Sequence, residues 1–195
     1  MAREQTASID LVDADTVKQL SAAVMIAALT AVLAQFSIDL PGGVPFSFQP
    51  FGIFFAGLLL GPVWGGFSIS LYILVGLAGA PVYSNAGAGL GYVLGPTGGF
   101  LIGFAVAAVV IGAVTHRSLT PIPIASLSAI PTAIALLAGL VAIYLIGLPW
   151  LASVNGWTFT RAASFMALFA VGDLLKTAIT TGIVAGGTEL LADRR

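Results

Sequence analysis

Residues 50–79 have the sequence PFGIFFAGLLLGPVWGGFSISLYILVGLAG and contain no charged side chain. About 20 apolar residues are enough for a helix to cross the hydrocarbon of a bilayer. This run is too long for one such helix and too short for two full spans. Gly61-Pro62 divides it, because a proline ends or kinks a helix at the preceding residue. We therefore predict a short helix at 50–60 and a longer one at 62–79.

Similar apolar stretches fill nearly the whole chain. Of its 195 residues, 58% are hydrophobic and 8% are charged, whereas soluble domains carry about a quarter charged residues. We predict an all-α integral membrane protein, surrounded by membrane lipid, with six transmembrane helices and irregular glycine-rich outer loops. A tail at 1–17 precedes a single membrane domain at 18–191, whose six helices lie at about 18–38, 50–60, 62–79, 98–115, 125–148 and 172–190. The last helix begins either at Phe159 or near Gly172, and the glycine favours a break there.

The basic residues predict how the chain lies in the cell membrane, because they concentrate on the cytoplasmic side. Arg161 is the one basic residue in the predicted outer loops 39–49, 80–97 and 151–161. With both termini in the cytoplasm, the inner side holds five: Arg3, Lys18, Arg117, Arg194 and Arg195. We therefore expect a multi-pass protein with a cytoplasmic tail and cytoplasmic ends.

The outer segment 80–97, APVYSNAGAGLGYVLGPT, has no charge but is rich in glycine and proline. Non-helical backbone at membrane depth is tolerated only where it is buried in protein or lines a cavity. This segment is therefore the first candidate for a binding site.

Asp173 and Lys176 are the ionisable side chains between residues 162 and 187. A charge in hydrocarbon costs several kcal/mol unless it is paired or hydrated. At a spacing of three, the two side chains lie on the same helix face. They either clasp a polar solute or form a plain intrahelical ion pair.

Small residues at every fourth position, namely Ala23, Ala27 and Ala31, let another backbone approach the first predicted helix closely. This row could dock a partner or pack internally.

Several function classes are excluded by what the sequence lacks. It has no cysteine, no P-loop, and one histidine, so we expect no metal site, no cofactor, no ATP hydrolysis by this chain and no Ser-His catalysis. A net charge of −1 predicts no nucleic-acid surface. We expect a protein that is not an enzyme.

Five segments resemble the BioY family, the biotin-specific substrate-binding components of energy-coupling factor (ECF) transporters. They are AALTAVLAQFSIDLP at 27–41, VPFSFQPFGIFFAGLLLGP at 44–62, LYILVGLAGAPVY at 71–83, GLGYVLGPTGGFLIGF at 89–104 and GDLLK at 172–176. The chain departs from the family pattern in SNAGAG at 84–89 and in the FAVGD approach to Asp173.

The resemblance implies a six-helix protein that captures biotin near its outer face and works with a transmembrane coupling subunit and two cytosolic ATPases. It implies that Asn85, Asp173 and Lys176 hold the ureido ring of biotin. It also implies that the alanine row contacts the coupling subunit. Further pocket walls are expected from the matching loop motifs, at Phe48, Gln49, Tyr83 and Tyr92.

Two other readings remain open. Sister families of the same architecture bind thiamin, riboflavin or other vitamins. A membrane enzyme acting on lipid would use Asp173 and Lys176 as acid and base. Transport by the chain alone, without an ATPase module, also remains open.

Overall fold

The computed structural model describes residues 13–40 and 42–192, with the side chains of these ranges except those of 124 and 188–192. Most of the predicted tail, 1–12, lies outside the described residues, as do Arg3, Arg194 and Arg195.

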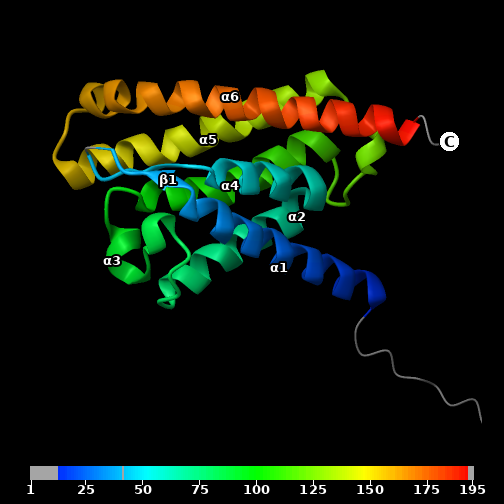
Figure 1. The fold of residues 1–195 in the computed structure, drawn as a ribbon, viewed down its shortest axis with the longest axis horizontal. Coiled ribbons are helices and arrows are strands. Elements are labelled where there is room, and N and C mark those ends of the chain that lie inside the picture. The colour runs from blue at the N-terminus through cyan, green and yellow to red at the C-terminus, as the bar shows by residue number, and fades with distance from the viewer. Residues whose placement is uncertain (1–12, 41, 193–195) are drawn as a thin grey trace, which may run out of the picture.

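The described chain is almost entirely helical. Its helices are α1 (Ala14–Gln35), α2 (Gln49–Leu77), α3 (Gly89–Leu94), α4 (Gly98–His116), α5 (Ala129–Asn155) and α6 (Phe159–Ala192), with 3-10 turns η1 (Ser84–Ala86) and η2 (Ile124–Ser126). Two short antiparallel strands, β1 (Ser37–Ile38) and β2 (Phe46–Ser47), follow α1. The long helices lie side by side, and α1 begins at the end of the molecule where α6 finishes, opposite α3 (Figure 1).

Five described helices are long and apolar enough to cross a membrane: α1, α2, α4, α5 and α6 up to Gly187. The predicted class, an all-α multi-pass membrane protein, is confirmed at this level. The predicted number of six spans differs from these five because it counts α2 as two helices.

Helix α2 reverses direction at Gly61, whose φ of 73° and ψ of −174° are not helical. The side-chain amide of Gln49 donates a hydrogen bond to the Tyr72 hydroxyl over 2.6 Å. In one straight helix these two residues would lie about 35 Å apart, at 1.5 Å per residue. Gly65 also packs so closely on Ala56 that a Cβ would lie 2.6 Å from the Ala56 carbonyl oxygen. The halves of α2 therefore form an antiparallel hairpin.

The structure corrects the last predicted helix. Helix α6 begins at Phe159 and continues without a break through Gly172, so 172–190 is only its second part. A glycine inside a helix costs only about 1 kcal/mol relative to alanine, too little to break a helix that is packed along its length. Gly172 serves a packing role instead, because the Phe46 ring occupies the space beside it.

Other predicted boundaries also shift. Helix α1 begins at Ala14, inside the predicted tail, and α5 extends past 148 through Pro149 to Asn155. It stops at Gly156, which has a left-handed φ of 62°. The segment 80–97 is less irregular than predicted, because it contains η1 and α3.

Helix α4 forms the centre of the core, between the α2 hairpin and α5. Gly112 of α4 meets the turn of the hairpin, where a Cβ would lie 2.4 Å from the Gly61 carbonyl carbon. Gly103 of α4 lies close to the backbone of α5, where a Cβ added to it would lie 3.0 Å from Ile143 Cα. These contacts bring α5, and with it α6, beside the cavity described next.

Candidate functional site

Asp173 lies at the centre of a polar cluster formed by α5 and α6. Lys176 Nζ donates to Asp173 Oδ1 over 2.9 Å, and the Tyr144 hydroxyl donates to Oδ2 over 2.8 Å. Asp173 is 8% exposed and Lys176 4%. The intrahelical ion pair considered from the sequence is therefore present, and a residue from a second helix completes it.

Phe46 of β2, in the loop between α1 and α2, covers this pair. Its ring centroid lies 4.0 Å from Lys176 Nζ, a cation–π contact. The same ring packs against Phe169, with centroids 6.0 Å apart.

A cavity that is partly open to solvent lies beside the cluster. Its walls are mainly apolar and include Phe100, Leu101, Phe104, Met166 and Phe169. Its polar lining consists of Ser47, Gln49, Tyr92, Thr97, Tyr144 and Asp173. Among these described lining residues, Asp173 is the charged one. Apolar walls with a few converging polar groups are typical of small-molecule sites.

Gln49 joins the cavity to the segment 80–97. Its side-chain oxygen accepts hydrogen bonds from Ser47 Oγ over 2.7 Å and from Ser84 Oγ over 2.9 Å. Its amide nitrogen donates to Tyr72. The predicted wall residue thus lines the cavity with its side-chain amide held in place from three directions.

Tyr83 and Tyr92 are stacked, with ring centroids 4.8 Å apart. Tyr92 lines the cavity, whereas Tyr83 is buried behind it and donates its hydroxyl to the Ile73 carbonyl over 2.6 Å. Burial, together with the neighbouring Tyr92, raises the pKa of Tyr83 to about 12. The bond from its hydroxyl to Ile73 holds the loop on α2.

Asn85 and Phe48 are not brought into the cavity lining. The Asn85 side chain donates to the Asp39 carboxylate and accepts from Ser37 Oγ over 2.9 Å, so it ties the segment 80–97 to the segment that follows α1. Its φ of 57° is left-handed. Phe48 is 44% exposed and stacks on Phe36.

The alanine row is divided between two environments. Ala23 is fully buried, and its carbonyl accepts a hydrogen bond from Ser68 Oγ over 2.7 Å. Ala27 and Ala31 instead line an apolar groove between α1 and the second half of α2. Internal packing therefore accounts for Ala23, Ala27 is buried at the floor of the groove with 7% exposure, and Ala31 is partly exposed beside it.

Sequence reasoning missed Tyr144, Tyr72 and Phe46. A signal existed for Tyr144, because it is the single tyrosine after residue 92 and falls in an apolar helix. A tyrosine hydroxyl buried in such a helix usually has a hydrogen-bond partner. Its partner, 29 residues further along the chain, could not be chosen from spacing.

Residues 4–193 match the model of the BioY family. The chain belongs to the BioY family. Its relatives within BioY include the probable biotin transporter of Pyrococcus horikoshii, 38% identical over 86% of this chain and 94% of that protein. The biotin transporter BioY of Rhodobacter capsulatus is 36% identical over 76% of this chain and 80% of the relative. The resemblance found in the sequence motifs is thereby confirmed.

A solved structure also matches the fold. It is the crystal structure of the S-component for biotin from an ECF-type ABC transporter, with a TM-score of 0.80 and 26% sequence identity. The match covers 91% of this chain and 94% of the other. These relatives are named as transporters rather than enzymes.

Proposed function

We propose that this chain binds biotin from outside the cell and serves its uptake as the substrate-binding component of an ECF-type transporter. The observation that carries the proposal is that Asp173 and Tyr144 line an apolar cavity, with Lys176 paired to Asp173. The names of the BioY relatives and of the structural neighbour support it.

The chemistry of biotin suits these groups. The two ureido N–H groups need an acceptor, which the Asp173 carboxylate offers, and the ureido carbonyl needs a donor, which Lys176 offers with an N–H that does not bond to Asp173. The thioether ring and the alkyl chain are apolar and suit walls such as Phe100 and Phe169. Hydrogen bonds to a charged group are each worth about 1.5–3 kcal/mol.

The remaining predicted residues take two kinds of role in this proposal. Gln49 and Tyr92 contact the ligand from the cavity wall, and Tyr83 supports Tyr92 from behind. Asn85 reaches the ligand by exchanging its present bonds to Asp39 and Ser37, while Phe48 stays at the outer edge.

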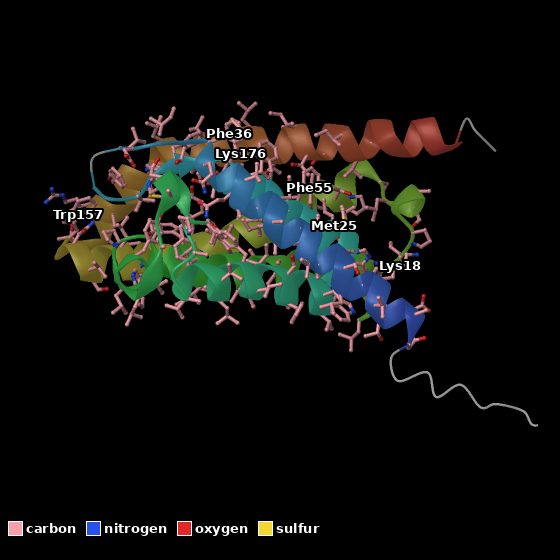
Figure 2. All side chains as sticks on the ribbon, turned by 60° about the horizontal axis from the view of Figure 1, so that its bottom comes forward. Lys18, Met25, Phe36, Phe55, Trp157 and Lys176 are labelled. Atoms are coloured by element: carbon pink, nitrogen blue, oxygen red, sulfur yellow. The ribbon has the colours of Figure 1, made fainter. Side chains whose placement is uncertain are left out.

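We propose six spans, counting each half of the α2 hairpin, with both termini in the cytoplasm. The start of α1 and the loop after α4 lie together, since Asp15, Thr16 and Leu119 line one surface hollow. Lys18 lies near that end and Trp157 at the opposite end (Figure 2). Arg161 stacks on Trp157, at 4.6 Å from the ring centroid. This distribution agrees with the basic bias of the inner side.

A transmembrane coupling subunit and two cytosolic ATPases would supply the energy. The groove beside Ala27 and Ala31 supports such a partner, because small residues let helices approach closely. Its other walls are Val24, Ala28, Leu71, Tyr72, Val75 and Val82.

Isothermal titration of the purified chain with biotin, thiamin and riboflavin tests the ligand. We expect saturable binding of biotin and none of the other two. Binding of thiamin or riboflavin without biotin would overturn the proposal while leaving the fold unchanged.

A further inference from the structure

We propose that Tyr144 is a positioning residue, which fixes the carboxylate of Asp173 so that the site selects a ligand presenting two N–H groups. This inference rests on the proposed function and assigns a role to a residue that the sequence motifs do not include.

The geometry of the carboxylate is the first step. Lys176 and Tyr144 each occupy one oxygen of Asp173, at 2.9 and 2.8 Å. An ionised carboxylate offers about four lone-pair positions, so each oxygen keeps one further acceptor position. Asp173 and Tyr144 both line the cavity, which places these positions within reach of a ligand.

The second step concerns rotation of the Asp173 carboxylate about its terminal torsion. The terminal torsion of an aspartate is broad, so a single bond to Lys176 on the same helix leaves the carboxylate free to turn. Tyr144 adds a second anchor from α5, and its own ring packs edge-on against Phe100, with centroids 6.3 Å apart. The two anchors together fix the plane in which Asp173 accepts hydrogen bonds.

Selectivity follows from a fixed plane. A ligand that presents two N–H groups can pair with the acceptors, whereas one that lacks an N–H leaves a buried acceptor unpaired, which is costly. If the carboxylate can turn, it adapts to either ligand, and the difference in binding affinity between the two ligands becomes smaller.

The test measures two ligands on five proteins. Biotin and a derivative methylated on one ureido nitrogen are titrated into the original chain, Tyr144→Phe, Asp173→Asn and the double variant. Thr177→Val is the matched control, because Thr177 Oγ1 bonds to the backbone carbonyl of Asp173 and not to its carboxylate.

We expect Tyr144→Phe to weaken biotin binding by about tenfold, the scale of one hydrogen bond of about 1.4 kcal/mol. Its preference for biotin over the methylated derivative should fall severalfold, which a loss of stability alone would not cause. In the Asp173→Asn background the same change should weaken binding by less than about twofold, because Tyr144 acts through the carboxylate. Thr177→Val should behave as the original chain.

Two results would overturn the inference. One is an unchanged affinity and preference in Tyr144→Phe. The other is a full further tenfold loss in the double variant, which would make Tyr144 a direct ligand contact. If the original chain does not bind biotin at all, the proposed function itself fails, so the two failures are distinguishable. A lower thermal midpoint of Tyr144→Phe does not affect the comparison, since both ligands are measured on the same folded protein.

Discussion

The ring of Phe46 fills the space beside Gly172, where a Cβ would lie 2.3 Å from Phe46 Cε2. This contact seats strand β2 of the loop between α1 and α2 on α6, one residue before Asp173. Because the same ring covers Lys176 Nζ, this loop and the charged pair are packed as one unit.

Gly172→Ala should therefore disturb both stability and binding. The added methyl group collides with Phe46, and overpacking of this kind costs about 1–3 kcal/mol. We expect a lower thermal midpoint in detergent and weaker biotin binding. Gly182→Ala is the control, because Gly182 lies in the same helix with nothing within 4 Å of its Cβ position. Adding Phe46→Leu to Gly172→Ala should recover part of the midpoint; equal midpoints for the two alanine variants would disprove the contact.

The turn of the α2 hairpin depends on Gly61. Its φ of 73° with ψ of −174° belongs to a region that glycine alone adopts readily, and other residues pay about 1–3 kcal/mol there. A Cβ would also lie 3.2 Å from Pro121 Cγ. Gly61→Ala should lower the thermal midpoint by several degrees, whereas Gly91→Ala, with free space and no such φ, should not. An unchanged thermal midpoint in Gly61→Ala would mean that α2 does not reverse at this residue.

The orientation can be tested by cysteine labelling, since the chain has no cysteine of its own. Leu90 on α3 is 59% exposed and Leu119 in the loop after α4 is 72% exposed. In intact cells an impermeant maleimide should label Leu90→Cys, and it should label Leu119→Cys only after lysis. The reverse pattern would invert the proposed topology. Ser84 lies in the same segment as Leu90, 80–97, but is 1% exposed and would report poorly.

If the groove beside Ala27 and Ala31 docks the coupling subunit, a change there should affect assembly with that subunit and leave biotin binding intact. Ala31→Trp places a large ring in the groove, away from the cavity beside Asp173. Biotin titration should be nearly unchanged, while co-purification with a coupling subunit and ATPases should be lost. Ile134→Trp on α5, where Ile134 is 56% exposed, is the control for a bulky change elsewhere on the surface. Retained co-purification of Ala31→Trp would remove the groove from the interface.

The sequence predicted features that follow from local pattern. Apolar runs identify the membrane helices, the Gly61-Pro62 pair marks the reversal in α2, and the spacing of Asp173 and Lys176 places them on one face. Each of these depends on residues close together in the chain, where helix geometry alone fixes the relationship.

The remaining features depend on contacts between distant segments. Gly172 reads locally as a helix breaker, and only the Phe46 ring beside it explains why α6 continues. The Tyr144–Asp173 bond joins two helices, and Asn85 bonds to Asp39 in the segment that follows α1. Such pairings depend on how helices pack and not on spacing, so the sequence alone left them open.

The most direct test of the central claim is isothermal titration of biotin into Asp173→Asn, Lys176→Met and the double variant. Asp173→Asn keeps the size of the side chain and removes its charge, so binding should fall by roughly tens-fold or more, at tenfold per 1.4 kcal/mol. Lys176→Met keeps the apolar stem and leaves Asp173 without its counter-charge, and it should also bind weakly. If both residues hold the ligand, the double variant stays weak although its stability recovers. A double variant that binds biotin like the original chain would show that the pair only neutralises itself, and would contradict the account.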